Sequence, residues 1–195
     1  MGPDRAKVDA MASPCPAADG SSPRQTRFDG PPPMCIDPSR RYGAEMVTSL
    51  GSLTIALDPV AAPKTVNNFV FLARYHYFDG LVFHRIITGF MCQGGDPEGN
   101  GRGGPGYRFA DELPKPGRYE VGSLAMANAG PDTNGSQFFI VSGPSGTSLP
   151  PSYSLFGKVV KGLEVVAAME AVPTGRNDRP QEDLLIESVT ITEAE

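Results

Sequence analysis

The residues that could do chemistry in this chain gather in three short segments. They are FHRIITGFMCQGGD at residues 83–96, SLAMANAGPDTNGSQFFI at residues 123–140 and LPPSYSLFGKV at residues 149–159. In the first segment, Arg85 carries a permanent charge and presents several hydrogen-bond donors in a fixed fork. Such a group can stabilise charge or a lone pair that develops during a reaction. An isolated arginine is more often a surface or ion-pair residue, so the surrounding pattern must support this interpretation.

Other kinds of site have weaker support. Asp96, Asp111 and Glu112 do not resemble a paired acid and base, and no Cys/His spacing suits zinc. The glycines of residues 101–106 match the spacing of a dinucleotide fingerprint, but no helix pattern follows them to bind a pyrophosphate. The net charge of −5, without a basic run, argues against a nucleic-acid binder.

Taken together, the three segments resemble the signature segments of the cyclophilin family of peptidyl-prolyl cis-trans isomerases. The resemblance covers about residues 45–192, with the segments in the family's order and close to its spacing. It implies an enzyme that accelerates rotation about X–Pro bonds and assists protein folding without a cofactor or a metal. The implied partners are proline-containing unfolded or flexible polypeptides, and the implied state is a monomer.

The resemblance also implies roles for particular residues. The catalytic set is matched by Arg85, by Gln93, which contacts the substrate backbone, and by Asn128. The substrate-binding residues of the proline pocket and its adjoining groove are matched by Phe90, Met91, Gly101, Ala127, Ala129, Gln137, Phe139, Leu149 and Tyr153. Tyr153 stands where many members have a histidine, and Ser148 where many have a tryptophan.

The chemistry of X–Pro rotation agrees with such a site. The peptide C–N bond has partial double-bond character, so rotation crosses a barrier of ~18–20 kcal/mol and takes roughly 10–100 s without a catalyst. A donor aimed at the proline nitrogen lone pair, which becomes available only in the twisted state, favours the transition state over both planar forms. Two alternatives stay open. One is a non-catalytic proline-peptide binding module or chaperone that uses the same groove, and the other is an RNA-linked or scaffold protein, which the acidic balance disfavours.

Short elements separated by turns surround these segments. Apolar runs bounded by turn residues predict strands at residues 46–50, 53–57, 82–87, 90–93, 121–127, 137–141, 155–159 and 184–192. Apolar residues at helical spacing predict helices at residues 62–75 and 163–170. This pattern predicts a mainly β fold. The resemblance specifies an eight-stranded antiparallel closed β-barrel capped by two α-helices, with the site on its outer face.

The beginning of the chain differs in composition from the rest. Residues 1–40 are rich in Pro, Ser, Ala, Asp and Gly, which predicts a flexible extension before an isomerase domain at residues 41–195. No stretch approaches the ~20 apolar residues of a membrane span, and the N-terminus lacks the pattern of a signal peptide. A cytoplasmic location is therefore expected. Export or membrane anchoring through a missing upstream segment is the alternative.

The chain has three cysteines. Cys92 lies within an apolar segment and is expected to be a small buried hydrophobe. Cys15 and Cys35 lie in the extension, where two free thiols are the simpler interpretation. The alternative hypothesis is a Cys15–Cys35 disulfide, which would imply an oxidising compartment.

Overall fold

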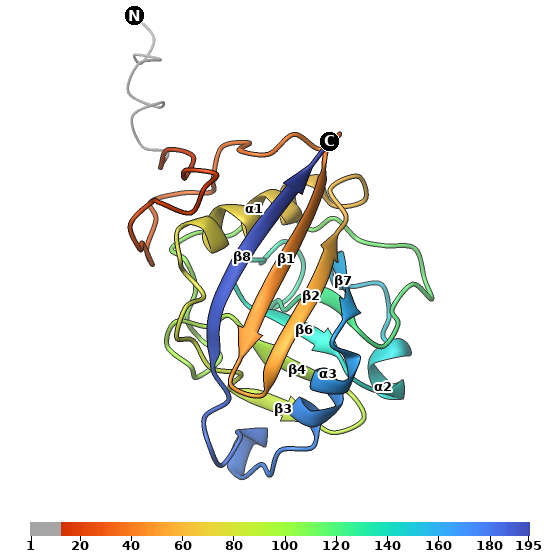
Figure 1. Cartoon of the computed structure of the whole chain (residues 1–195). Coiled ribbons are helices and arrows are strands. Elements are labelled where there is room, and N and C mark those ends of the chain that lie inside the picture. The colour runs from red at the N-terminus through yellow and green to blue at the C-terminus, as the bar shows by residue number, and fades with distance from the viewer. Residues whose placement is uncertain (1–12) are drawn as a thin grey trace, which may run out of the picture.

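Eight antiparallel strands dominate residues 13–195, the part of the chain that the computed structural model describes (Figure 1). The strands are β1 (Arg41–Thr48), β2 (Gly51–Leu57), β3 (Arg85–Ile87), β4 (Met91–Gly94), β5 (Ser123–Met126), β6 (Phe138–Val141), β7 (Leu155–Lys161) and β8 (Ile186–Ala194). They form one sheet in the order β3-β4-β6-β5-β7-β2-β1-β8. Each lies at or near a predicted strand, so the eight-stranded antiparallel architecture is confirmed.

The sheet curls into a half-barrel rather than a fully closed barrel. Its two edge strands, β3 and β8, share no continuous ladder. The residues beside them approach through the isolated bridge between Val82 and Leu185, and the Phe83 N–H donates to the Leu184 carbonyl at 2.9 Å. The prediction of a closed barrel was therefore slightly overstated, because β3 has only three residues and does not extend far enough to pair with β8.

In the part of the chain that the structure describes, three α-helices accompany the sheet, in place of the two that were predicted. The two predicted helices are α1 (Pro63–Arg74) and α3 (Leu163–Glu170). The additional helix, α2 (Pro144–Thr147), has four residues, which is too short to produce a periodic apolar pattern. Proline begins both α1 and α2, where its missing N–H and its fixed φ suit a first helical turn.

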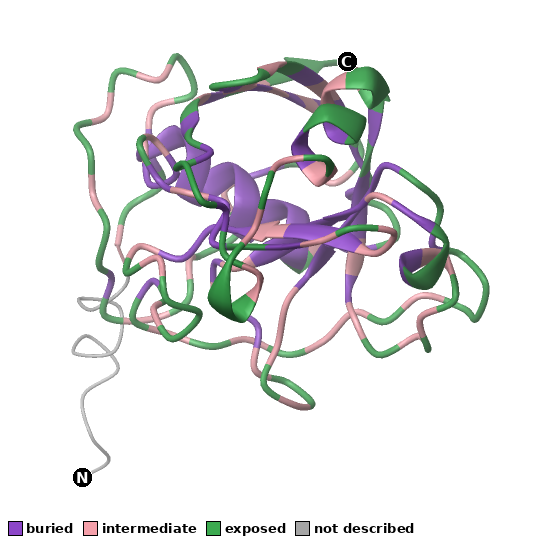
Figure 2. Ribbon diagram, turned by 90° about the horizontal axis from the view of Figure 1, so that it is seen from below, coloured by how far each residue is buried: buried purple, intermediate pink, exposed green. Residues whose placement is uncertain are grey.

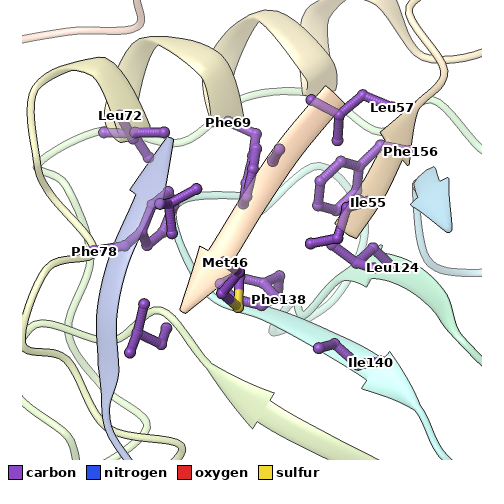
Figure 3. Packing of buried hydrophobic residues seen from close by; sticks show 14 of the residues in the cluster. Met46, Ile55, Leu57, Phe69, Leu72, Phe78, Leu124, Phe138, Ile140 and Phe156 are labelled. Atoms are coloured by element: carbon purple, nitrogen blue, oxygen red, sulfur yellow. The ribbon is translucent and has the colours of Figure 1, made fainter. Parts of the chain in front are cut away.

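The main core lies between α1 and the inner face of the sheet (Figure 3). Phe69 of α1 packs against Phe78, Phe138 and Phe156, with ring centroids 5.1, 5.8 and 5.4 Å apart. Full burial of such a side chain contributes roughly 1.5–3 kcal/mol to the free energy of folding. Figure 2 shows that buried residues concentrate in α1 and the strands, whereas exposed residues lie in α3 and the loops. The core thus makes a rigid support for the outer face.

Residues 13–40, for which composition favours a flexible extension, have no helix or strand but lie packed against the domain. We call them the strap; residues 1–12 lie outside the described residues. Phe28 is 3% exposed, and its ring centroid lies 5.0 Å from that of Phe71 and 5.4 Å from that of Tyr75. Buried Asn67 of α1 accepts a hydrogen bond from the Cys35 N–H at 2.7 Å. A few apolar and polar contacts therefore order a segment whose average composition is that of a loop.

The strap also contains a disulfide between Cys15 and Cys35. The expectation of two free thiols was therefore wrong. Contacts with α1 and with Tyr75, the residue after this helix, bring the two cysteines together. The Tyr75 hydroxyl donates to the carbonyl of Pro14 at 2.7 Å, and the Asn67 side chain accepts the Cys35 N–H. Cys92 is buried and free, as expected, and burial raises the pKa of its thiol to about 12.

Candidate active site

One row of residues on the sheet carries the predicted catalytic arginine. Arg85 on β3 pairs with Gln93 on β4, Gln93 pairs with Phe139 on β6, and Phe139 pairs with Ala125 on β5. Directly paired residues of antiparallel strands present their side chains on the same face. The register therefore places a cation, an amide and an aromatic ring side by side on one surface of the sheet.

The neighbouring row of the same strands faces the other way. Ile86, Cys92, Ile140 and Leu124 pair with one another in turn and belong to the main core. Successive side chains of a strand point to opposite faces. The row that contains Arg85 is therefore on the outer face, as the resemblance implied.

A second apolar cluster, separate from the main core, covers this outer face. Its buried members are Met91, Tyr119, Ala125, Phe139 and Val141. Phe90, Leu149 and Tyr153 pack against it and are only partly buried. The structure thus brings together the residues predicted for the proline pocket, with Met91 and Phe139 beneath and the other three at the surface. We call this group the apolar cluster.

Tyr119 belongs to the apolar cluster but was missed from the sequence. Its hydroxyl donates to the Tyr153 carbonyl at 2.7 Å and accepts from the Tyr153 N–H at 3.2 Å. Tyr153 in turn meets the ring of Phe139 edge-on, with centroids 5.4 Å apart. Tyr119 lies in an irregular segment before β5, so no periodic pattern marked it, and only the folded chain reveals that it holds Tyr153 in place.

A chain of amide hydrogen bonds leads away from the Arg85 row. Gln93 Nε2 donates to Gln137 Oε1 at 3.0 Å, and Gln137 Nε2 donates to the Gly103 carbonyl at 2.9 Å. These bonds orient both side chains and connect the sheet to the glycine-rich loop at residues 95–106. Each amide has one defined orientation, so the surface offered to a peptide is preorganised.

Asn128 uses its side chain to hold its own loop. Its Nδ2 donates to the Ser152 carbonyl at 2.9 Å, and its Oδ1 accepts from the Gly130 N–H at 3.2 Å. Within residues 13–195, the backbone N–H and carbonyl of Asn128 have no hydrogen-bond partner. Since buried or docked backbone groups need partners, the peptide groups of Asn128, more than its side chain, are suited to bind a substrate backbone.

A pocket of about 470 Å³ lies beside the apolar cluster. Its lining includes the remaining predicted site residues, namely Gln93, Gly101, Ala127, Asn128, Ala129 and Gln137. Ala127 also packs against the apolar cluster, so the two regions are continuous. The predicted site residues therefore lie on one continuous surface, which we call the groove, with Arg85 and the apolar cluster at one end and this pocket at the other.

Arg85 is held near a carboxylate that the sequence did not reveal. Its Nε lies 3.9 Å from Oδ2 of Asp178, which belongs to the short 3-10 helix η2 (Arg176–Asp178). The two side chains are 46% and 49% exposed. An ion pair this exposed is weak, so it biases the direction of the guanidinium while leaving it accessible to a ligand.

A buried carboxylate shapes the loop that borders the pocket. Asp96 accepts backbone N–H groups from Glu98 at 2.8 Å, Asn100 at 2.9 Å and Gly101 at 2.5 Å. Burial acts to raise the pKa of Asp96, but these donors together outweigh it and the pKa is lowered. His84, predicted to be structural, is buried behind this loop, and burial lowers its pKa.

This arrangement defines a class of protein. A half-barrel whose outer face combines an accessible cation, oriented amides and an apolar cluster is suited to bind an apolar ring together with the peptide backbone around it. The family model for cyclophilin-type peptidyl-prolyl cis-trans isomerases matches residues 44–191, and the chain belongs to this family.

Relatives and solved structures agree with this assignment. The chain is 49% identical over 167 residues to peptidyl-prolyl cis-trans isomerase B of Streptomyces anulatus, covering 76% of this chain and 95% of the relative. It is 47% identical to peptidyl-prolyl cis-trans isomerase A of Mycobacterium tuberculosis, covering 76% and 91%. A cyclophilin-type isomerase structure from Cryptosporidium parvum, determined in the presence of the dipeptide Ala-Pro, is 36% identical with a TM-score of 0.72, covering 77% and 98%.

The chain is accordingly a peptidyl-prolyl cis-trans isomerase. Cyclophilin domains bind proline-containing peptides. Within residues 13–195, no helix combines the length and the apolar character that crossing a bilayer requires.

Proposed function

We propose that this isomerase acts as a monomer on X–Pro bonds in unfolded or flexible polypeptides, with Arg85 as the donor to the twisted imide nitrogen. The observation that carries the proposal is the single register row of Arg85, Gln93 and Phe139. It puts a charged donor and an apolar surface on the same face of neighbouring strands. The acidic balance of the chain favours polypeptides over nucleic acid as partners.

The proposed reaction begins with two kinds of binding. The proline ring packs on the apolar cluster above Met91 and Phe139. The chain on one side of the proline hydrogen-bonds to the backbone of Asn128 and to Gln93. Because one side of the X–Pro bond is held by the ring and the other by backbone contacts, rotation about the C–N bond becomes the remaining movement.

Arg85 then stabilises the state halfway through the rotation. Twisting removes the overlap between the nitrogen lone pair and the carbonyl, so the nitrogen becomes pyramidal and can accept a hydrogen bond. A guanidinium hydrogen bond to this lone pair exists in the twisted state only and therefore lowers the barrier. Shortening roughly 10–100 s to milliseconds needs about 10⁴–10⁵-fold, or about 5.5–7 kcal/mol. One preorganised donor supplies about 2.7–4 kcal/mol of this, and positioning of the substrate supplies the rest.

We further propose that the protein works in an oxidising compartment, in place of the cytoplasmic location expected from its sequence. The Cys15–Cys35 disulfide supports this, because structural disulfides persist where thiols are not kept reduced. The disulfide holds a strap that is packed on the domain by Phe28 and Asn67, which makes it part of the fold. The domain that carries the groove contains the free Cys92 only.

Two-dimensional exchange spectroscopy on a short proline peptide tests the proposed catalytic role. We expect the wild-type chain to accelerate cis–trans exchange and Arg85→Ala to lose about 100–1,000-fold in kcat/KM. Arg41→Ala, which removes an exposed arginine on β1, is the matched control and should behave as wild type. If Arg85→Ala stays within about two-fold of wild type, equivalent to ~0.4 kcal/mol, the role assigned to Arg85 is wrong.

A further inference from the structure

The strap reaches the groove through a close contact with the glycine-rich loop. The Phe28 N–H donates to the Pro105 carbonyl at 2.8 Å. A Cβ on the next loop residue, Gly106, would lie 2.3 Å from the Phe28 carbonyl oxygen, and its φ of +104° is one that other residues rarely adopt. Glycine at position 106 therefore lets the strap lie directly on the loop that borders the pocket.

This contact brings an arginine from the strap to the substrate groove. Arg27, the neighbour of Phe28, lines the pocket next to the apolar cluster, as do Arg102 and Arg108 of the loop. Glu98 is the one carboxylate among the described residues of the lining. None of the three arginines forms an ion pair within residues 13–195. Three arginines and a single carboxylate residue thus line the pocket.

We propose that Arg27, together with Arg102 and Arg108, makes this pocket a subsite for an acidic side chain of the substrate. The preferred substrate then carries a glutamate or aspartate a few residues to one side of the proline. The inference rests on the proposed function, because it requires the substrate to lie across Arg85 and Asn128. Both the pocket and the catalytic row contain Gln93, so one extended peptide can occupy the two regions together.

Arg27 lies outside residues 44–191, the part of the chain that matches the family model. Its position depends on the strap, which is fixed on both sides of it. The Phe28 ring lies in the aromatic group of Phe71, Tyr75 and Tyr107, and the disulfide links Cys15 to Cys35 across it. The subsite therefore combines a loop of the isomerase domain with a residue that this chain adds to it.

The test is a comparison of kcat/KM for matched peptides. In an otherwise neutral proline peptide, one position at a time, among the three before and the three after the proline, carries either Glu or Gln. For each position we record kcat/KM of the Glu peptide divided by kcat/KM of the Gln peptide. We expect wild type to favour Glu by about two- to five-fold, the range for exposed ion pairs, at positions on one side of the proline. Added salt should reduce the ratio because it screens exposed charges.

Variants of the full-length, disulfide-bonded chain assign the preference. Arg27→Gln should lower the ratio toward one, while Arg102 and Arg108 still contribute, and Arg27→Glu should lower it further. Arg24→Gln removes an equal charge from the same strap at an exposed position outside the pocket lining and should keep the wild-type ratio. No Glu preference in wild type, or an equal loss in Arg24→Gln and Arg27→Gln, would overturn the proposal. Arg85→Ala is measured on both peptides as a separate variant. Its loss of turnover tests the proposed catalytic role, whereas the preference for Glu over Gln in wild type tests the subsite, so the two proposals fail independently.

Discussion

Arg85 and Gln93 face each other across β3 and β4, in register and on the same side of the sheet. The pairing connects two parts of the site. Arg85 adjoins the apolar cluster, while Gln93 is linked by hydrogen bonds through Gln137 to the loop at Gly103. A movement of the loop would reach the catalytic row through two hydrogen bonds. If Arg85 and the groove act as proposed, two hydrogen bonds connect the row that carries the donor to the imide nitrogen with the groups that hold the flanking chain.

Removal of the Tyr119 hydroxyl should weaken substrate binding. Tyr119→Phe keeps the ring but loses both hydrogen bonds to the Tyr153 backbone, so Tyr153 is less firmly held against Phe139. We expect KM to rise by about two- to ten-fold, the equivalent of ~0.5–1.5 kcal/mol for a hydrogen bond, with kcat little changed. Tyr42→Phe removes another buried tyrosine hydroxyl, which accepts the Asp37 N–H, and is the control. Equal KM values in both variants would contradict a positioning role.

Thiol titration distinguishes the cysteines. Under non-reducing conditions the native protein should show no reactive thiol, because Cys92 is buried and burial raises its pKa to about 12. Unfolding in denaturant should release one thiol, and reduction should then raise the count to three, the number of cysteines in the chain. Three thiols in the unreduced, unfolded protein would exclude the disulfide and remove the support for an oxidising compartment.

Truncation of Phe28 should release the strap while the domain stays folded. A buried phenylalanine replaced by alanine costs about 3–5 kcal/mol, and here the cost falls on the contact between the strap and the aromatic residues of α1 and its end. We expect trypsin to cleave Phe28→Ala after Arg24 and Arg27 at least about tenfold faster than wild type, since local opening governs proteolysis. Met34→Ala, at a 52% exposed strap position, is the control. Wild-type resistance in Phe28→Ala would show that other contacts hold the strap.

His84 should make stability depend on pH below neutrality. Burial lowers its pKa in the folded state below the ordinary value of 6.5, with Asp96 opposing this and Arg179 and Arg85 adding to it. The stabilising effect is complete above pH 6.5 and is lost as the pH falls, because the unfolded state then binds a proton that the folded state excludes. Urea unfolding between pH 7.5 and 5.5 should therefore show a steeper loss for wild type than for His84→Gln. Parallel profiles would refute the assignment, and both proteins retain His76, so the comparison isolates His84.

Much of the site could be predicted because its residues lie in short contiguous segments. Arg85, Phe90, Met91 and Gln93 fall within nine residues of one hairpin, where strand alternation already determines which side chains share a face. The strands and the helices α1 and α3 were likewise visible as local patterns of apolar residues. Strand ends were not, because hydrogen bonding between distant segments decides them, and the four-residue α2 is too short to show a periodic pattern.

The amino-acid sequence by itself determined the strands and the two main helices, since these follow from local spacing, and its three segments identified the family, whose resemblance implied the groove residues. Only the tertiary structure decided that Tyr119 supports Tyr153, that Asp178 approaches Arg85, and that the strap is ordered. These contacts join residues that are far apart in the chain, and no local propensity encodes them. The disulfide and the position of Arg27 likewise depend on where α1 and the glycine-rich loop lie in the folded protein, because they provide the surfaces on which the strap docks.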